Sequence, residues 1–224
     1  AIIATSAVRS VRDLKGSKVA FQAVSPSDFL LGYALARAGL SEKDVRPVNS
    51  TPEGVPGIMA SGAVDAGVTY EPSVSTTLRL GGGKQFHVLL SSRDARGMIT
   101  DVLAVRAATI AKDPVLVEGL IRGTLDGLAF MKAEPDRAAA VIASTLGITP
   151  GEVRAQLSNI ENPPLSRLDD VFRRSDELPS FEASGKVIGA ILEREGQIRA
   201  LPPIDETFDA RFVRALQANV GDLK

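Results

Sequence analysis

Two short polar segments carry the side chains of this sequence that are best placed to meet a ligand. Ser25 and Ser27 follow one apolar run, and Tyr70 and Glu71 follow another. Each segment stands between a predicted strand and a predicted helix, and in open α/β sheets ligands bind at the carboxyl ends of the strands. Hydroxyls, a ring face and a carboxylate at such an edge indicate recognition of a small molecule.

The serine segment is open to two interpretations. A helix that begins near Pro26 would direct unpaired backbone N–H groups and the positive end of its dipole at the ligand, which binds an anion without Lys or Arg. Ser25 and Ser27 would then add hydroxyl donors. In the alternative interpretation, the two serines only cap the helix.

The second segment and one acid further along are equally open. Tyr70 presents a ring face and a hydroxyl to a ligand, or it packs at the end of the sheet. Glu71 accepts hydrogen bonds from a ligand or holds a hinge, or it caps the helix that starts near Pro72. Asp101 precedes the apolar segment Val102–Val105, where it reaches a ligand amine, braces a hinge, or lies exposed as an ordinary acid at the start of a strand.

Alternating strands and helices must position these residues, and this alternation predicts an α/β fold with a mainly parallel sheet. The first three predicted strands are expected to be neighbours in one sheet. The predicted strands are Lys18–Ala23, Arg46–Asn49, Val64–Thr69, Phe86–Leu90 and Asp101–Val105. Helices are expected over residues 25–38, 52–61 and 72–80, in a long helix from Asp113, and over 135–146, 149–157, 181–197 and 208–217.

The composition excludes several classes of function. The 26 Lys and Arg balance 27 Asp and Glu, which removes a general electrostatic case for nucleic acid or a membrane surface as partner. No apolar run approaches the roughly 18 residues of a spanning helix, so no membrane insertion is expected. The chain has no Cys and one His, and the hydrolase, phosphate-loop and zinc-protease motifs are absent. We therefore expect no catalytic residue, no metal and no cofactor.

Three blocks of the sequence resemble one protein family. Ser61–Pro72 matches its Ser-Gly-x-Val-Asp-Ala-x-x-x-Trp/Tyr-Asp/Glu-Pro signature, Asp13–Ala20 resembles its Asp-Leu-Lys-Gly block, and Gly39–Val45 resembles its Gly-Leu-x-x-x-Asp-Val link. Lys112–Pro114, with the long helix behind it, also fits. The resemblance covers about residues 1–157. It is to periplasmic solute-binding proteins of the nitrate/taurine/alkanesulfonate (NitT/TauT, NMT1/THI5-like) type, which are the receptors of ABC importers.

The resemblance implies a type II periplasmic-binding-protein-like fold, in which two lobes with mainly parallel sheets meet at a hinge. Residues 1–11 would form a crossing strand, 12–95 the second lobe, and 96–224 the hinge return and the mainly helical C-terminal part of the first lobe. In the family, half of the first lobe precedes the crossing strand, so we expect the first lobe to be incomplete here. Residues 107–224 should then expose apolar surface that this half covers.

The function implied is that of the extracytoplasmic solute-binding component of an ABC transporter, periplasmic or lipid-anchored. It would capture a small, anionic, sulfonate-like solute by hinge closure and deliver it to a membrane permease. The family's ligand commonly touches the loop that holds Ser25 and Ser27 here. Two alternatives keep the fold: an enzyme of the thiamine-pyrimidine or menaquinone pathways, or the ligand-sensing domain of a regulator. The thiamine-pyrimidine enzyme relies on a His and a Cys-rich segment that this sequence does not offer.

Overall fold

The computed structural model describes residues 1–194 and 196–221, which form two compact units. Unit 1 consists of Ala1–Ile99 and Ser175–Pro202, and unit 2 begins with Thr100–Arg174 and continues from Pro203. The chain therefore leaves unit 1, returns to it and leaves it again.

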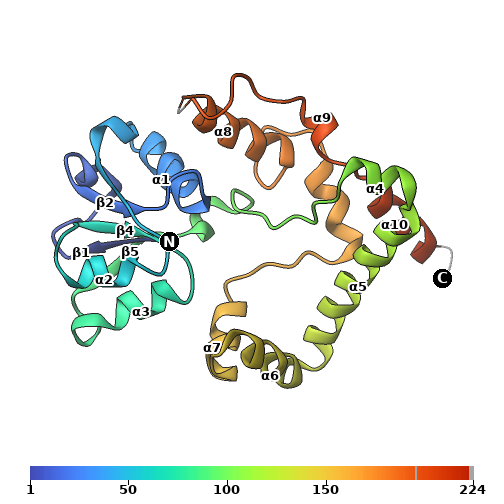
Figure 1. The fold of residues 1–224 in the computed structure, drawn as a ribbon, viewed down its shortest axis with the longest axis horizontal. Helices are drawn as coiled ribbons and strands as arrows, with labels where there is room; N and C mark the ends of the chain where they lie inside the picture. Colours follow the sequence, from blue (N-terminus) through green and yellow to red (C-terminus); the bar gives the residue numbers. More distant parts are fainter. Residues whose placement is uncertain (195, 222–224) are drawn as a thin grey trace. The chain divides into compact units, whose positions relative to one another are not determined.

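A five-stranded sheet forms the centre of unit 1 (Figure 1). Its strand order is β3 (Arg46–Asn49), β2 (Lys18–Phe21), β4 (Ala66–Val68), β1 (Ile2–Thr5) and β5 (Phe86–Leu90). β2 pairs in parallel with both β3 and β4, while β1 is antiparallel to both β4 and β5. Hence β1 alone runs against the other four strands. The predicted neighbourhood of the first three strands is confirmed, although β2 and β4 are shorter than expected.

Helices cover both faces of this sheet because successive strand residues point to opposite sides. Ile2 and Val19 pack in one apolar cluster with α1 (Pro26–Arg37) and α8 (Phe181–Arg194). Ile3 and Ala20 pack in a second cluster, which includes side chains of α2 (Val55–Ala60) and α3 (Ser73–Arg79). Short 3₁₀ turns complete the unit at Val11–Leu14, Glu42–Asp44, Leu80–Gly83 and Ser92–Ala95.

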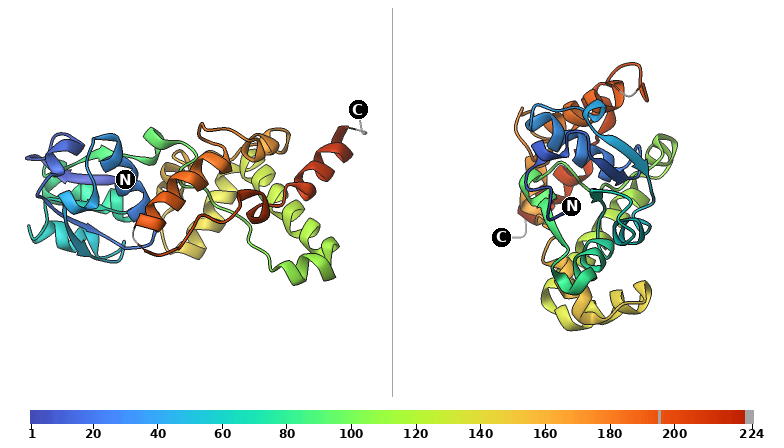
Figure 2. Two further views of the ribbon diagram at one scale, coloured as in Figure 1. Left: turned by 90° about the horizontal axis from the view of Figure 1, so that it is seen from above. Right: turned by 90° about the vertical axis from the view of Figure 1, so that its left-hand side faces the viewer.

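Unit 2 is helical, and its described residues contain no strand (Figure 2). Asp113 begins its longest helix as predicted, since its carboxylate accepts a hydrogen bond from Leu116 N at 2.9 Å. The helices are α4 (Ala107–Lys112), α5 (Pro114–Ala133), α6 (Pro135–Leu146), α7 (Pro150–Leu157), α9 (Ile204–Thr207) and α10 (Arg211–Gly221), with a 3₁₀ segment at Leu165–Phe172. The buried core between α6 and α7 is small and consists of Ala139, Ala143 and Val153.

The predicted strand Asp101–Val105 is wrong, because this segment has no regular secondary structure. Its side chains are open to solvent, with Val102 58% and Leu103 53% exposed. An apolar run becomes a strand only where a neighbouring strand completes its hydrogen bonds. The described residues hold a single sheet, and this segment does not lie in it.

The C-terminal region also differs from the expected organisation. Residues 96–224 were expected to form the hinge return and the mainly helical C-terminal part of the first lobe. Within this range, Ser175–Pro202 belongs to unit 1, where α8 packs against α1. The helix expected over 181–197 ends at Arg194, and the one expected over 208–217 is observed as α10, which begins later, at Arg211, and extends to Gly221. Packing between residues far apart in the sequence decides where these helices end and which unit a segment joins. The local sequence pattern does not specify that packing.

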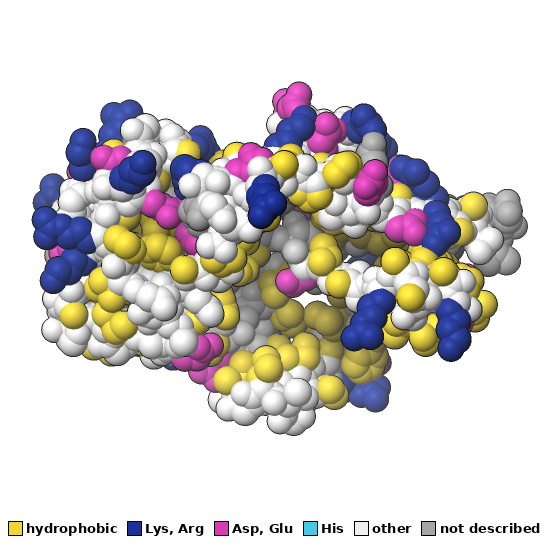
Figure 3. Space-filling view, turned by 45° about the horizontal axis from the view of Figure 1, so that its top comes forward, with side chains coloured by type: hydrophobic (Ala, Val, Ile, Leu, Met, Phe, Trp, Pro, Cys, Tyr) yellow, Lys and Arg dark blue, Asp and Glu magenta, His cyan; other side chains and the backbone are white. Residues whose placement is uncertain are grey.

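Apolar side chains are exposed along the long helix of unit 2. Val117 is the buried residue of α5, whereas Val115 is 77%, Leu116 48% and Leu120 44% exposed. The expected exposure of apolar surface in this region is therefore observed. Figure 3 shows hydrophobic side chains exposed between charged side chains of both signs on the face drawn. Among the described residues, no helix has the length and hydropathy needed to cross a membrane.

Candidate ligand-binding edge

The two predicted binding segments lie at one edge of the sheet in unit 1. β2 and β4 are adjacent and parallel, with Val19 opposite Ala66 and Ala20 opposite Gly67. The turn with Ser25 and Ser27 follows β2, and Tyr70 follows β4, so both segments continue from the carboxyl ends of neighbouring strands. We call this the carboxyl edge. It is the position at which open α/β sheets bind ligands.

Ser25 is fully engaged in capping α1. Its hydroxyl donates to the Gln22 carbonyl at 2.7 Å and accepts a hydrogen bond from Ser27 N at 3.2 Å. The helix starts here for local reasons, because Ser25 is extended and Pro26 fits the first helical position. The capping interpretation therefore describes what Ser25 does in this structure.

Ser27 differs from Ser25 in one decisive respect. It is 3% exposed, and its Oγ has no hydrogen-bond partner among the described residues. A buried hydroxyl without a partner is costly, so such groups in native proteins are usually satisfied by a ligand or an ordered water. Of the two serines, Ser27 is the one with a free donor at the helix N-terminus.

The N-terminus of α1 offers fewer backbone donors than the helix pattern alone predicts. Pro26 has no N–H, and the N–H groups of Ser27 and Phe29 donate to Ser25. The buried Asp28, at 1% exposure, adds a carboxylate that accepts a hydrogen bond from Val24 N at 2.7 Å. The dipole and the Ser27 hydroxyl remain available to an anion, and the Asp28 carboxylate opposes it.

The turn before α1 contains backbone strain. Val24 has φ of 53°, in the left-handed region that a β-branched residue rarely adopts, and its side chain is 50% exposed. Strain of this kind persists where surrounding contacts enforce it, and it concentrates at ligand-binding turns. It supports a functional interpretation of the Val24–Asp28 turn.

Tyr70 and Glu71 have different environments at the end of β4. Tyr70 is 49% exposed, so its ring is not packed at the sheet end and is open to a ligand. Glu71 Oε2 accepts a hydrogen bond from Ser75 N at 3.1 Å, which caps the first turn of α3. Glu71 thus caps α3, whereas about half of the Tyr70 surface is exposed to solvent.

Asp101 is not in the unit that holds the other four predicted residues. It is exposed and lies in unit 2, in the segment without regular structure. Ser25, Ser27, Tyr70 and Glu71 are together in unit 1. Among the described residues there is also no group of three His, Cys, Asp or Glu side chains suited to hold a metal ion.

Sequence reasoning overlooked a third segment at the carboxyl edge. Ser50 and Thr51 follow β3, and the buried Thr69 hydroxyl at the end of β4 donates to the Pro52 carbonyl at 2.9 Å. This bond ties the segments after β3 and β4 together. The signal was the polar run Asn49–Thr51, which begins at the last residue of a predicted strand.

Two residues within Ser61–Pro72, the signature residue Asp65 and the neighbouring Gly67, prove to be structural. Asp65 Oδ2 accepts a hydrogen bond from Lys18 N at 2.8 Å, which fixes the start of β2 beside β4. At Gly67, a Cβ atom would lie 2.5 Å from Cγ1 of Val55, so only Gly allows α2 to approach the strand this closely. Asp65 therefore holds β2 beside β4, and Gly67 lets α2 pack closely on β4.

This combination defines an α/β unit with a candidate ligand-binding edge, and comparison with known proteins identifies the family of the chain. The sequence profile of the NMT1/THI5-like family matches residues 1–138. The match covers more than half of the chain, and the chain belongs to this family. The resemblance noted in the sequence is confirmed.

Two of the curated relatives are named after the small molecules they bind. A putative aliphatic sulfonates-binding protein of Escherichia coli K12 is 31% identical over 159 residues, which are 71% of this chain and 48% of that protein. The riboflavin-binding protein RibY of Chloroflexus aurantiacus is 32% identical over 130 residues, or 58% of this chain and 36% of that protein. The chain thus spans at most about half the length of the curated relatives it matches.

Solved structures confirm the type II periplasmic-binding-protein-like fold. The periplasmic aliphatic sulphonate binding protein SsuA from Escherichia coli matches with a TM-score of 0.72 at 24% identity, covering 91% of this chain and 63% of that chain. A putative SsuA from Methylobacillus flagellatus reaches 0.74 at 16% identity, covering 98% and 66%. The desulfurization enzyme DszB matches at 0.60 and 14% identity, covering 97% and 75%. At these identities the likeness concerns the fold alone.

Proposed function

We propose that the chain is part of an extracytoplasmic solute-binding protein that serves an ABC importer. The observation that carries this proposal is the carboxyl edge. There the buried, unpartnered Ser27 hydroxyl and the half-exposed Tyr70 ring follow adjacent parallel strands. Membership of the NMT1/THI5-like family supports the same function.

The proposed solute is small and anionic, with a sulfonate-like head group. A sulfonate is ionised at all physiological pH values and accepts hydrogen bonds through three oxygens, which suits neutral hydroxyl donors at a helix N-terminus. The polar segments that follow β2, β3 and β4 offer Ser, Thr and Tyr hydroxyls as neutral donors and contain no Lys or Arg. Their acids Asp28 and Glu71 accept hydrogen bonds from backbone N–H groups of the same segments. The name of the Escherichia coli relative points to the same ligand class.

In this proposal the solute is captured by hinge closure of a two-lobed protein, which then presents the closed form to a membrane permease. The solute shifts the population towards the closed form because it binds that form more tightly than the open one. The size of the shift is set by the difference between the two affinities. Glu71 and Asp101 are kept as candidate ligand contacts, together with Ser25, Ser27 and Tyr70. Unlike an enzyme, the protein would bind and release its solute unchanged, and the likeness to DszB extends only to the fold.

Calorimetric titration of the full-length protein tests this proposal. Ethanesulfonate, nitrate and propionate serve as anionic probes, and ethylamine serves as the cationic control. We expect saturable binding of ethanesulfonate, and at 100 times its dissociation constant about 2.7 kcal/mol of added stability. Binding of ethylamine with no response to any of the anions would contradict the proposed ligand class.

A further inference from the structure

A surface groove separates α1 from α8 on unit 1 and does not include the carboxyl-edge residues. Its volume is about 530 Å³, and it is lined by Gly32, Tyr33, Ala36, Arg37, Lys186, Val187, Ala190, Ile191 and Arg194. The floor is closely packed: a Cβ atom at Gly32 would lie 3.2 Å from Ile191 Cδ1. Ala36 and Ala190 are exposed, and their small side chains leave space between the helices.

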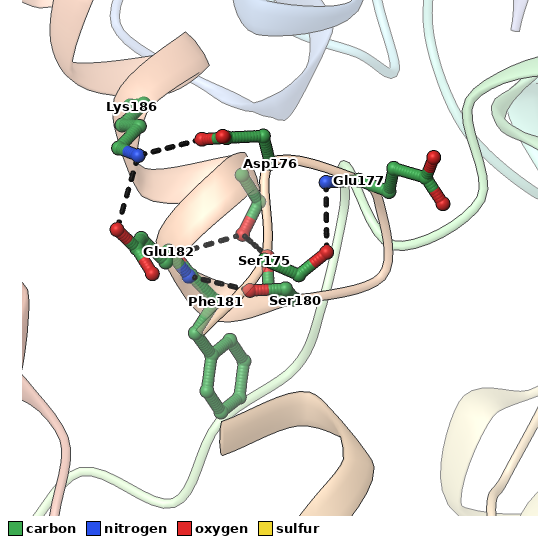
Figure 4. A network of polar contacts seen from close by, with 8 residues as sticks. Ser175, Asp176, Glu177, Ser180, Phe181, Glu182 and Lys186 are labelled. Atoms are coloured by element: carbon green, nitrogen blue, oxygen red, sulfur yellow. Dashed lines mark hydrogen bonds and ion pairs between the residues drawn. The ribbon is translucent and has the colours of Figure 1, made fainter. Parts of the chain in front are cut away.

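Three cationic side chains surround this apolar floor. Lys186 pairs with both Asp176 and Glu182 (Figure 4), with Nζ–oxygen distances of 2.7 Å and 3.0 Å. Arg194 pairs with Glu42 at 3.1 Å. These two cations are therefore balanced by carboxylates of the same unit.

Arg37 has a different partner. It donates to the Tyr33 hydroxyl at 3.1 Å, and its guanidinium carbon lies 5.7 Å from the centre of the Tyr33 ring. This partner is neutral, so the contact orients the guanidinium without offsetting its charge. The groove thus combines space for an apolar side chain with a positive charge at its rim. An acidic side chain of a partner would form an ion pair with this charge.

We propose that this groove docks a segment of the membrane permease that inserts an apolar side chain between Ala36 and Ala190 and pairs an Asp or Glu with Arg37. The proposal rests on the proposed function, because the permease is the partner which that function supplies. An apolar centre with a charged rim is the usual anatomy of a specific protein interface. The rim charge would select the partner and orient its approach.

A second copy of the chain fits the groove less well than a permease segment. A symmetric dimer brings the same patch of both copies together, so Arg37 of one copy, whose partner Tyr33 is neutral, would lie near Arg37 of the other. Like charges across an interface are unfavourable. A partner with an acidic residue meets the groove without this repulsion.

Photo-crosslinking in the native host tests the proposal. Ala190 is replaced by p-benzoylphenylalanine, and the exposed Arg46 on β3 is replaced in the same way as a control outside the groove. We expect irradiation to link position 190, but not position 46, to the permease subunit, as identified by mass spectrometry of the adduct. Arg37→Glu should lower the yield at position 190 about tenfold or more, whereas Arg46→Glu should leave it unchanged.

Three outcomes would overturn the proposal. These are an adduct between two copies of this chain, an adduct with phospholipid alone, or a yield of permease adduct at position 190 no higher than that at position 46. Ala36→Arg, which obstructs the groove from the neighbouring helix face, provides a second variant if Arg37→Glu alters folding by circular dichroism. Ethanesulfonate titration of each variant separates the two proposals. Lost crosslinking with unchanged binding identifies the groove as the docking site, whereas crosslinking without anion binding contradicts only the proposed ligand.

Discussion

Val24 donates its backbone N–H to the buried carboxylate of Asp28 at 2.7 Å, and this bond closes the turn in which Ser27 is held. The same turn places Val24 at a positive φ of 53°. A charged acceptor at the first turn of a helix favours both the bond and the helix dipole. Asp28 thus stabilises a strained backbone on which the candidate site depends.

Replacing Asp28 by Ala should destabilise the protein by about 1–3 kcal/mol, because the Val24 N–H loses its charged acceptor and α1 loses an acid in its first turn. Urea unfolding followed by circular dichroism measures this loss. Glu53→Ala is the control, since Glu53 is an exposed acid in the same unit and its removal should change stability by less than about 0.5 kcal/mol. Equal effects of the two substitutions would refute the role given to Asp28.

Gly67→Ala should cost about 1–3 kcal/mol, because the added Cβ would lie 2.5 Å from Cγ1 of Val55. Val55→Ala removes the clashing methyl groups, so the double variant should be more stable than the sum of the two single losses predicts. Gly57→Ala is the control within α2, where a Cβ meets nothing within 4 Å. That substitution should be neutral or stabilise by up to about 1 kcal/mol. Additive losses in the double-mutant cycle would exclude the proposed clash.

The ion pair between Asp176 and Lys186 should make a small contribution to stability that depends on pH. The hydrogen bond from Lys186 and its charge lower the pKa of Asp176, and the hydrogen bonds to Asp176 and Glu182 raise the pKa of Lys186. The Asp176 contribution is therefore present above the ordinary pKa of Asp, about 3.9, and is lost as the pH falls through its lowered value. The Lys186 contribution is present below the ordinary pKa of Lys, about 10.4, and is lost as the pH rises through its raised pKa.

Lys186→Met tests this linkage. Its stability relative to the natural chain should be lowest between about pH 4 and pH 10 and should recover at either extreme. Carbon NMR titration of the Asp176 carboxyl should show its pKa rising towards the ordinary Asp value. A pKa of Asp176 that is unchanged in this variant would show that another group lowers it.

The sequence contained enough information for the parallel strands and the helix caps of unit 1, because these are local features. Apolar runs followed by polar turns identified β2, β3 and β4, and the Ser25-Pro26 pair identified the start of α1. The sequence did not contain enough information to predict the structure of Asp101–Val105. The apolar pattern of this segment suits a strand, but the segment has no partner strand among the described residues. Strand formation is decided by neighbours that a local pattern does not specify.

The sequence was sufficient to predict where the candidate site lies, but not what each of its residues does there. Ser25 and Ser27 are the same residue type two positions apart, yet one is used as a cap and the other is buried without a partner. Helix geometry turns neighbouring positions in different directions, so the distinction follows from packing. The same holds for Tyr70 and Glu71, of which only Glu71 caps α3 in this structure.

Tyr70→Ala should weaken the binding of ethanesulfonate by the full-length protein more than any single hydroxyl deletion at the carboxyl edge. The substitution removes a half-exposed ring together with its hydroxyl, so both contact area and a hydrogen bond are lost. Isothermal titration should show a loss of about 1–3 kcal/mol, and Tyr70→Phe should retain the part that the ring supplies. Unchanged affinity in both variants would place Tyr70 outside the site.

Ser27→Ala should have opposite effects on stability and on binding. In the absence of ligand, removing a buried hydroxyl that has no partner relieves its desolvation cost, so the free energy of unfolding should rise by about 1 kcal/mol. With ethanesulfonate, the same change deletes a donor and should weaken binding by about 0.5–1.5 kcal/mol, roughly twofold to tenfold in the dissociation constant.

Ser25→Ala is the matched control for this prediction. It removes the helix cap, so it should lower the free energy of unfolding by about 0.5–2 kcal/mol. The two serine variants should therefore change stability in opposite directions, which urea unfolding of the ligand-free protein can measure. If Ser27→Ala instead destabilises as Ser25→Ala does and leaves the affinity unchanged, its hydroxyl has a structural partner and the anion binds elsewhere. A gain in stability combined with a loss in affinity would show that the buried Ser27 hydroxyl destabilises the ligand-free protein and hydrogen-bonds to the bound ligand.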